Sequence, residues 1–140
     1  AVLPHLLDQG GGVIVTTAAY SAHSPKDFLF AYASLKAGLT NFTKNIAKTY
    51  GPQGIRANCV CPGAVETGAL AGRREAAAAE FNLPLDQALE HVMFNVWKMP
   101  VALRRLGQPE EVGDLMAFCL SERAPYMTGA TINIDGGTDF

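Results

Sequence analysis

The chain has 140 residues, 49% of them hydrophobic and 17% charged, with a formal net charge of −2 at pH 7. This composition is typical of one globular unit, and no apolar run is long enough to span a bilayer, so we expect no membrane partner. The Lys and Arg residues are dispersed and the balance is acidic, which disfavours the counterion release that drives nucleic-acid binding, so we expect no nucleic-acid partner.

The N-terminal elements are predicted to be a helix and a strand. Residues 3–7 form the end of the helix, and the glycines at 10–12 break it. Residues 13–17 are β-branched without polar alternation, which predicts a strand covered on both faces. Because the glycine run precedes a strand and does not open a helix, we interpret it as a turn and not as a phosphate-binding loop.

A loop through residues 21–27 leads into a long amphipathic helix that carries Tyr32 and Lys36 and runs to about Tyr50. The Gly-Pro-Gln-Gly sequence at 51–54 ends this helix. Residues 55–61 predict a second buried strand, closed by Pro62 and Gly63.

The remaining elements complete an alternation of helices and strands. Residues 66–99 are predicted to form two short helices over a ligand cleft, interrupted by Pro84, and a packing hairpin without a ligand role is an equal alternative. A helix follows from Gln108, and residues 131–134 form a last strand. With no internal repeat or linker, this alternation predicts one α/β unit with a mainly parallel sheet.

The cysteines and histidines do not predict a metal site. The odd number of cysteines lacks the spacing of a disulfide framework, which indicates a reducing, cytoplasmic environment. Cys59 and Cys61 share one face of a strand and are expected to be core thiols, in preference to zinc ligands. The histidines His5, His23 and His91 have no metal-ligand spacing; His23 is favoured as a surface residue over a ligand contact.

Tyr32 and Lys36 form a Tyr-x-x-x-Lys pair on the long helix. Residues four apart lie on one helix face, with roughly 5–6 Å between Cβ atoms, so the ammonium can lie beside the phenol and favour its ionised form. Such a phenol can pass a proton to or from an alcohol or carbonyl oxygen. Many helices carry the same spacing as a packed ring and a solvated amine, so the surrounding motifs must decide between these interpretations.

Four segments, at residues 32–36, 55–63, 105–112 and 128–137, occur in an order and spacing that resemble the C-terminal half of a short-chain dehydrogenase/reductase. The resemblance covers nearly the whole chain. It implies the C-terminal portion of a Rossmann-like doubly wound parallel sheet, with about three strands and flanking helices. It also implies that residues 1–140 are a single partial domain.

The resemblance assigns roles to particular residues. Tyr32 would be the general acid or base, and Lys36 would support it and bind the nicotinamide ribose. The turn from Pro62 to Thr67 would hold the cofactor carboxamide through the backbone of Val65 and the hydroxyl of Thr67, with Gly63 allowing close approach. The implied cofactor-binding set is therefore Tyr32, Lys36, Pro62, Gly63, Val65 and Thr67. Considered alone, the turn is equally compatible with a helix capped by Thr67.

Two departures from the family pattern affect the site. The family's catalytic Ser should fall near Ala19, and loss of such a donor costs roughly 2.7–4 kcal/mol of transition-state stabilisation. Ser21 is the favoured substitute and Thr17 the alternative. The second departure is that the glycine-rich dinucleotide loop, the ribose selector and the catalytic Asn would all precede residue 1. We therefore expect this chain to be a fragment that is inactive alone, and the choice between NAD and NADP stays open.

Two functions follow from these motifs. The first is an NAD(P)-dependent oxidoreductase that interconverts an alcohol and a ketone or aldehyde. The alternative is a non-catalytic partner subunit or scaffold, suggested by the missing Ser. The resemblance also implies a homodimer or homotetramer, for which the long helix and the C-terminal strand supply apolar surface. Phe28, Phe81, Phe94 and Trp97 are expected either in an apolar pocket wall or in the core.

Overall fold

The computed structural model describes residues 2–24 and 28–138, so part of the predicted loop at 25–27 and residues 139–140 lie outside the described residues. Its helices and strands follow in the order α1 (Val2–Asp8), β1 (Gly12–Thr17), η1 (Tyr20–Ala22), α2 (Phe30–Tyr50), η2 (Gly51–Gln53), β2 (Ile55–Pro62), α3 (Gly68–Phe81), α4 (Leu85–His91), η3 (Val92–Val96), α5 (Pro109–Leu120) and β3 (Thr131–Ile134). The predicted alternation of helices and strands is confirmed.

The strands form a three-stranded parallel sheet, as the sequence predicted, and their order in it is β1-β2-β3. Val13 pairs with Arg56, and Cys59 pairs with Thr131. The central strand β2 is buried along most of its length, whereas β1 is only half-buried. Helices α2 and α5 both contact β1, as expected for a strand covered on both faces, and β1 is only half-buried because among the described residues it pairs with β2 alone and forms an edge of the sheet.

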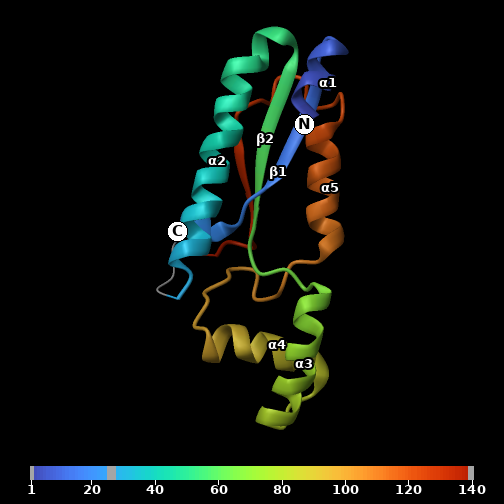
Figure 1. Cartoon of the computed structure of the whole chain (residues 1–140). Coiled ribbons are helices and arrows are strands. Elements are labelled where there is room, and N and C mark those ends of the chain that lie inside the picture. The colour runs from blue at the N-terminus through green and yellow to red at the C-terminus, as the bar shows by residue number, and fades with distance from the viewer. Residues whose placement is uncertain (1, 25–27, 139–140) are drawn as a thin grey trace.

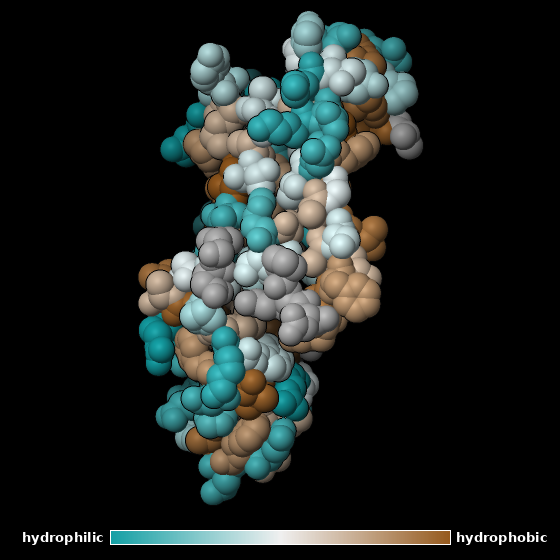
Figure 2. Space-filling model, turned by 90° about the vertical axis from the view of Figure 1, so that its left-hand side faces the viewer, coloured by the Kyte–Doolittle hydropathy of each residue, from teal (hydrophilic) through white to brown (hydrophobic). Residues whose placement is uncertain are grey.

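Helices cover both faces of the sheet, with α2 on one side and α5 on the other (Figure 1). Successive side chains of β1 contact opposite layers: Thr16 Oγ1 lies 2.7 Å from Thr43 Oγ1 of α2, and Thr17 Oγ1 lies 3.9 Å from Met116 Sδ of α5. Figure 2 views the α2 side and shows hydrophobic patches among hydrophilic ones.

The cysteines are free thiols within this layered core. Cys59 and Cys61 are fully enclosed and pack with Ala18 and Leu39, and Cys119 is enclosed as well. Burial, followed by the neighbouring Cys59, raises the pKa of the Cys61 thiol to about 12. The prediction that Cys59 and Cys61 are core thiols is confirmed.

Helices α3 and α4 form a lobe beyond the carboxyl ends of the strands (Figure 1). The two short helices predicted for this region are present, and a π-helical turn, η3, follows α4. The core of the lobe contains Leu89, Met93, Val101 and Leu106, all nearly inaccessible to solvent. This packing places the lobe over the end of the sheet where the site residues lie.

The predicted glycine turn joins α1 to β1. Gly10 and Gly11 have φ angles of 81° and 152°, which favour glycine, and a Cβ on Gly11 would lie 2.8 Å from the carbonyl oxygen of Gly54. The glycine run therefore packs against the turn after α2. None of the described helices is long and apolar enough to cross a membrane.

Candidate active site

The predicted catalytic pair and the predicted turn border one hollow of about 420 Å³ at the carboxyl ends of β1 and β2. Helix α2 contributes Tyr32 and Lys36, the end of β2 contributes Pro62, and the turn that follows contributes Gly63, Val65 and Thr67. The remaining lining residues are Thr17, Ala18, Ala19, Pro109 and Val112. Open parallel sheets bind ligands at this end of their strands.

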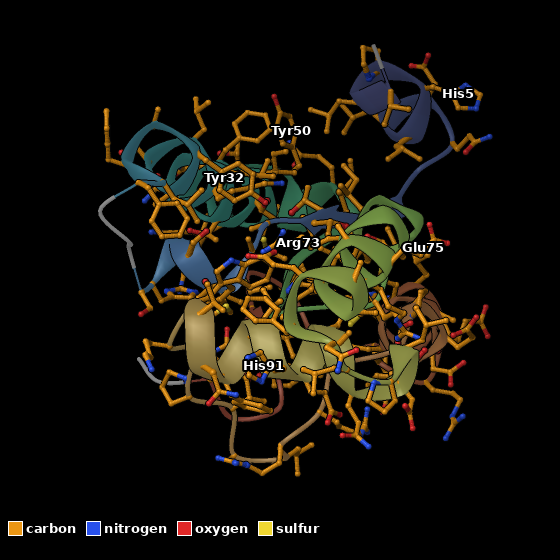
Figure 3. All side chains as sticks on the ribbon, turned by 90° about the horizontal axis from the view of Figure 1, so that it is seen from below. His5, Tyr32, Tyr50, Arg73, Glu75 and His91 are labelled. Atoms are coloured by element: carbon orange, nitrogen blue, oxygen red, sulfur yellow. The ribbon has the colours of Figure 1, made fainter. Side chains whose placement is uncertain are left out.

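Lys36 is fixed in position by the strand beside it. Its Nζ donates a hydrogen bond to the carbonyl oxygen of Thr17 at 3.0 Å and lies 5.5 Å from the centre of the Tyr32 ring. Tyr32 is 46% exposed and lies on α2 (Figure 3). The pair therefore combines a positioned cation with a solvent-accessible phenol.

Backbone hydrogen bonds join the turn after β2 to the segment before α5. Glu66 N donates to Gly107 O at 2.8 Å, and Gly107 N donates to Ala64 O at 2.9 Å. Neither of these two hydrogen bonds uses the N–H of Val65. Thr67 occupies the N-cap position of α3 but makes no side-chain capping bond within the part of the chain that the structure describes, which does not support the alternative in which its hydroxyl caps the helix.

Gly63 is required by the protein's own packing. A Cβ at this position would lie 2.7 Å from the Cα of Asp135, at the end of β3. The sequence interpretation attributed this glycine to the close approach of a ligand. The contact with Asp135 also requires a glycine here and fixes the start of the turn, while the close approach of a ligand stays a prediction.

The hydroxyl groups near Ala19 occupy different positions. Ala18 and Ala19 line the hollow, and Thr17 lines it too, although the Thr17 hydroxyl contacts Met116. Ser21 lies in η1, is 1% exposed and is not one of the lining residues. Its Oγ is buried without a hydrogen-bond partner among the described residues.

A second hollow of about 350 Å³ adjoins the first, and the two share Gly63 and Val65. Its other lining residues are Tyr20, Phe28, Leu29, Ala64, Leu70, Trp97 and Met99. Two of the four aromatic residues considered for a pocket wall, Phe28 and Trp97, therefore lie in one. Phe81 and Phe94 pack instead against the cores of the α3–α4 lobe.

Several lining residues were not identified from the sequence. Leu70 and Met99 belong to segments predicted as helices over a cleft, and their apolar character alone does not separate a cleft position from a core position. Tyr20 and Leu29 flank the loop before α2. Their position on either side of a loop leading to the Tyr32 helix is the signal that could have identified them.

A polar network links the turn to α3 and α5, and the sequence analysis did not identify it. The carboxylate of Glu66 accepts from Arg74 of α3, and its other oxygen lies 3.4 Å from Gln108 Nε2. Nearby, Arg105 donates to the two oxygens of Glu111 at 2.8 and 2.6 Å. This guanidinium, together with the backbone N–H of Gln108, lowers the pKa of Glu111 to about 2.

The histidines lie apart from one another. His5 is on α1 and His91 is on α4, in separate parts of the molecule (Figure 3). His23 Nε2 lies 3.8 Å from the enclosed thiol of Cys61. Within residues 2–24 and 28–138, no group of three or more His, Cys, Asp or Glu side chains could hold a metal ion.

Comparisons with known proteins identify relatives of this chain. A family model described as Enoyl-(Acyl carrier protein) reductase matches residues 1–139. Human Dehydrogenase/reductase SDR family member 4 is 33% identical over 138 residues, which is 99% of this chain and 45% of that protein. The chain thus spans about half the length of the curated relatives that it matches.

Solved structures show the same fold. L-sorbose reductase from Gluconobacter frateurii, complexed with NADPH and L-sorbose, superposes with a TM-score of 0.84 at 28% identity over 96% of this chain and 49% of that chain. A short chain oxidoreductase from Pseudomonas aeruginosa, described as containing an atypical catalytic center, superposes with a TM-score of 0.84 at 30% identity over 96% of this chain and 50% of that chain.

Proposed function

The chain belongs to the short-chain dehydrogenase/reductase family, and from that premise we propose that it is part of an NAD(P)-dependent oxidoreductase that interconverts an alcohol and a ketone or aldehyde. One observation carries the proposal. Tyr32, Lys36 and the turn from Pro62 to Thr67 border the same hollow at the carboxyl end of the sheet.

The hollow offers a donor set suited to a nicotinamide nucleoside. Lys36 Nζ and the Tyr32 hydroxyl would bind ribose hydroxyls, while the N–H of Val65 and the hydroxyl of Thr67 would hold the carboxamide. Pro62 and Gly63 shape the start of this turn. When bound, the coenzyme would supply or accept the hydride, and these residues would position it beside the substrate carbon. Both NAD and NADP fit this part of the site.

Tyr32 would transfer the proton. In carbonyl reduction its phenol would donate to the substrate oxygen, and in alcohol oxidation the phenolate would take that proton back. Lys36, whose Nζ donates a hydrogen bond to the carbonyl oxygen of Thr17, places a positive charge beside the ring. The phenol and the ammonium therefore act together, each through its placement on α2.

Ser21 is the proposed second donor to the substrate oxygen. Its support is the unpartnered Oγ in η1, directly after the alanines that line the hollow. Because Ser21 is enclosed, this role requires η1 to shift when substrate binds. Thr17 is the alternative donor, since it already borders the hollow.

We also propose self-association and a cytoplasmic location. The side chains of Phe30, Leu35 and Phe42 on α2 are well exposed, which suits a homodimer or homotetramer interface, and sedimentation at micromolar concentration would test it. Three free, enclosed cysteines suit a reducing compartment.

The second candidate function is a non-catalytic partner subunit or scaffold, favoured by Ala18 and Ala19 where the family places a Ser. The test is NAD(P)H oxidation by the full-length protein with a panel of ketones and aldehydes. The enzyme proposal expects turnover that Tyr32→Phe nearly abolishes. Undiminished turnover in that variant would refute the mechanism, and absence of turnover with both coenzymes would favour the scaffold.

A further inference from the structure

We infer that the second hollow binds an uncharged, largely apolar carbonyl compound and rejects a polyhydroxylated one. The inference rests on the proposed function, because it names the substrate class of the same site. It starts from the chemistry of the wall: Phe28, Leu29, Leu70, Trp97 and Met99 present carbon and thioether surface. Among the described lining residues, none carries a charge.

The position of the hollow suits a substrate of this kind. Gly63 and Val65 border both hollows, so a ligand body in the apolar hollow can direct its carbonyl group across this boundary towards Tyr32. A volume of about 350 Å³ is within the range typical of small-molecule sites. The first hollow would thus bind the coenzyme, and the second would bind the body of the substrate.

Exposed aromatic side chains at the hollow provide an independent observation. Phe28 is 78% exposed and Trp97 is 39% exposed, although both border a concave site. Leaving such large apolar side chains in water is unfavourable, and an apolar ligand would cover them. A polyhydroxylated ligand would gain little from this contact and would leave hydroxyl groups without partners.

The backbone holds Trp97 in place for this role. Trp97 follows the π-helical turn η3, and its N–H donates to Val92 O at 2.8 Å. Met99 N donates to Met93 O at 3.0 Å, and the side chains of Val92 and Met93 are fully enclosed. Lys98, between the two wall residues, has a φ of 52°. The wall is therefore anchored to the lobe core, which reduces the ordering cost of binding.

The test compares 2-tetralone, an uncharged bicyclic ketone, with L-sorbose, a polyhydroxylated ketone. Binding of each to the full-length protein is measured by saturation-transfer NMR, and kcat/KM is measured with NADH and NADPH. We expect 2-tetralone to bind, L-sorbose to give no detectable binding, and kcat/KM to favour 2-tetralone at least a hundredfold. Trp97→Gln should weaken 2-tetralone binding at least tenfold, whereas Val96→Gln, on an exposed neighbour outside the wall, should not.

The possible outcomes separate this inference from the proposed function. Binding of 2-tetralone that depends on Trp97, without turnover of any ketone, would support the ligand class and count against the oxidoreductase. Turnover that favours L-sorbose would overturn the ligand class and leave the oxidoreductase standing. Equal effects of Trp97→Gln and Val96→Gln, or no effect of either, would also overturn the inference.

Discussion

Lys36 Nζ donates a hydrogen bond to the carbonyl oxygen of Thr17 at 3.0 Å, joining α2 to the carboxyl end of β1. The bond connects two elements that carry different parts of the proposed mechanism, because the strand leads to Ala19 and the helix carries Tyr32. It also fixes the ammonium 5.5 Å from the Tyr32 ring centre. The cation is therefore positioned by the sheet before any coenzyme binds.

The first prediction concerns this cation. Lys36→Met keeps most of the side-chain length but removes the charge and the bond to Thr17, so turnover should fall by about a hundredfold or more. Initial rates of NAD(P)H oxidation by the full-length protein measure the loss. Lys48→Met, an exposed lysine in the last turn of α2, is the matched control and should leave turnover unchanged. Near-normal rates in Lys36→Met would contradict the proposed role.

The second prediction concerns Gly63. In Gly63→Ala the new Cβ would fall 2.7 Å from Asp135 Cα, which forces a backbone shift and should destabilise the fold by about 1–3 kcal/mol. Urea unfolding followed by circular dichroism measures this change.

Gly113→Ala is the control for Gly63→Ala. Gly113 lies inside α5 with nothing within 4 Å of a Cβ, so alanine should stabilise the protein by about 0.5–1 kcal/mol. If both variants changed stability in the same direction, the contact with Asp135 would not be the cause.

Patterns local in sequence predicted much of the fold and the proposed site. The last strand, Thr131–Ile134, has its predicted bounds, and α2 ends at Tyr50 as expected. Helical spacing identified Tyr32 and Lys36 as a pair, and the resemblance of short motifs to the family identified the turn from Pro62. They lie at one hollow because the carboxyl ends of parallel strands meet at the same edge of the sheet.

The features that were not predicted depend on tertiary contacts. A β-branched run looks alike in a central strand and in an edge strand, so the half-exposure of β1 had no sequence signal. Residues 92–96 show helical periodicity, which does not distinguish an α-helix from the π-helical turn that the structure has there, with Val92 and Met93 buried. The enclosure of Ser21, two residues after Ala19, likewise depends on how η1 packs.

The third prediction concerns the link between the turn and α3. Arg74 pairs with Glu66 in a partly shielded position, whereas Arg73 pairs with the more exposed Glu80 at 3.4 Å. Arg74→Met should therefore speed amide hydrogen exchange in α3 severalfold, because α3 loses its polar attachment to the turn. Arg73→Met, the adjacent control, should have little effect. Equal acceleration in the two variants would point to lost helix propensity and not to the link.

The fourth prediction concerns acid stability. Arg105 lowers the pKa of Glu111 from 4.5 to about 2, so the contribution of Glu111 to stability is complete above the ordinary value and is lost as pH falls through about 2. Between these values the unfolded chain binds a proton that the folded chain does not, and stability falls with falling pH. Glu111→Gln should flatten this dependence in urea-midpoint measurements across the window.

Glu110→Gln provides the comparison for the acid prediction, since Glu110 is an exposed carboxylate in the same first turn of α5. Its variant should retain the wild-type slope. A slope that stays steep in Glu111→Gln would mean that other carboxylates govern the acid transition.

The fifth prediction concerns the hydroxyl that assists Tyr32. Ser21→Ala should lower turnover by roughly a hundredfold if Ser21 is the second donor. It should not destabilise the fold, because the Ser21 Oγ is buried without a partner among the described residues. Adding Ala19→Ser to Ser21→Ala should restore turnover, since residue 19 lines the hollow and can present a hydroxyl there.

Thr17→Val tests the alternative donor. A loss of turnover in this variant alone would transfer the role to Thr17, and no loss in either Thr17→Val or Ser21→Ala would show that Tyr32 acts without a second hydroxyl.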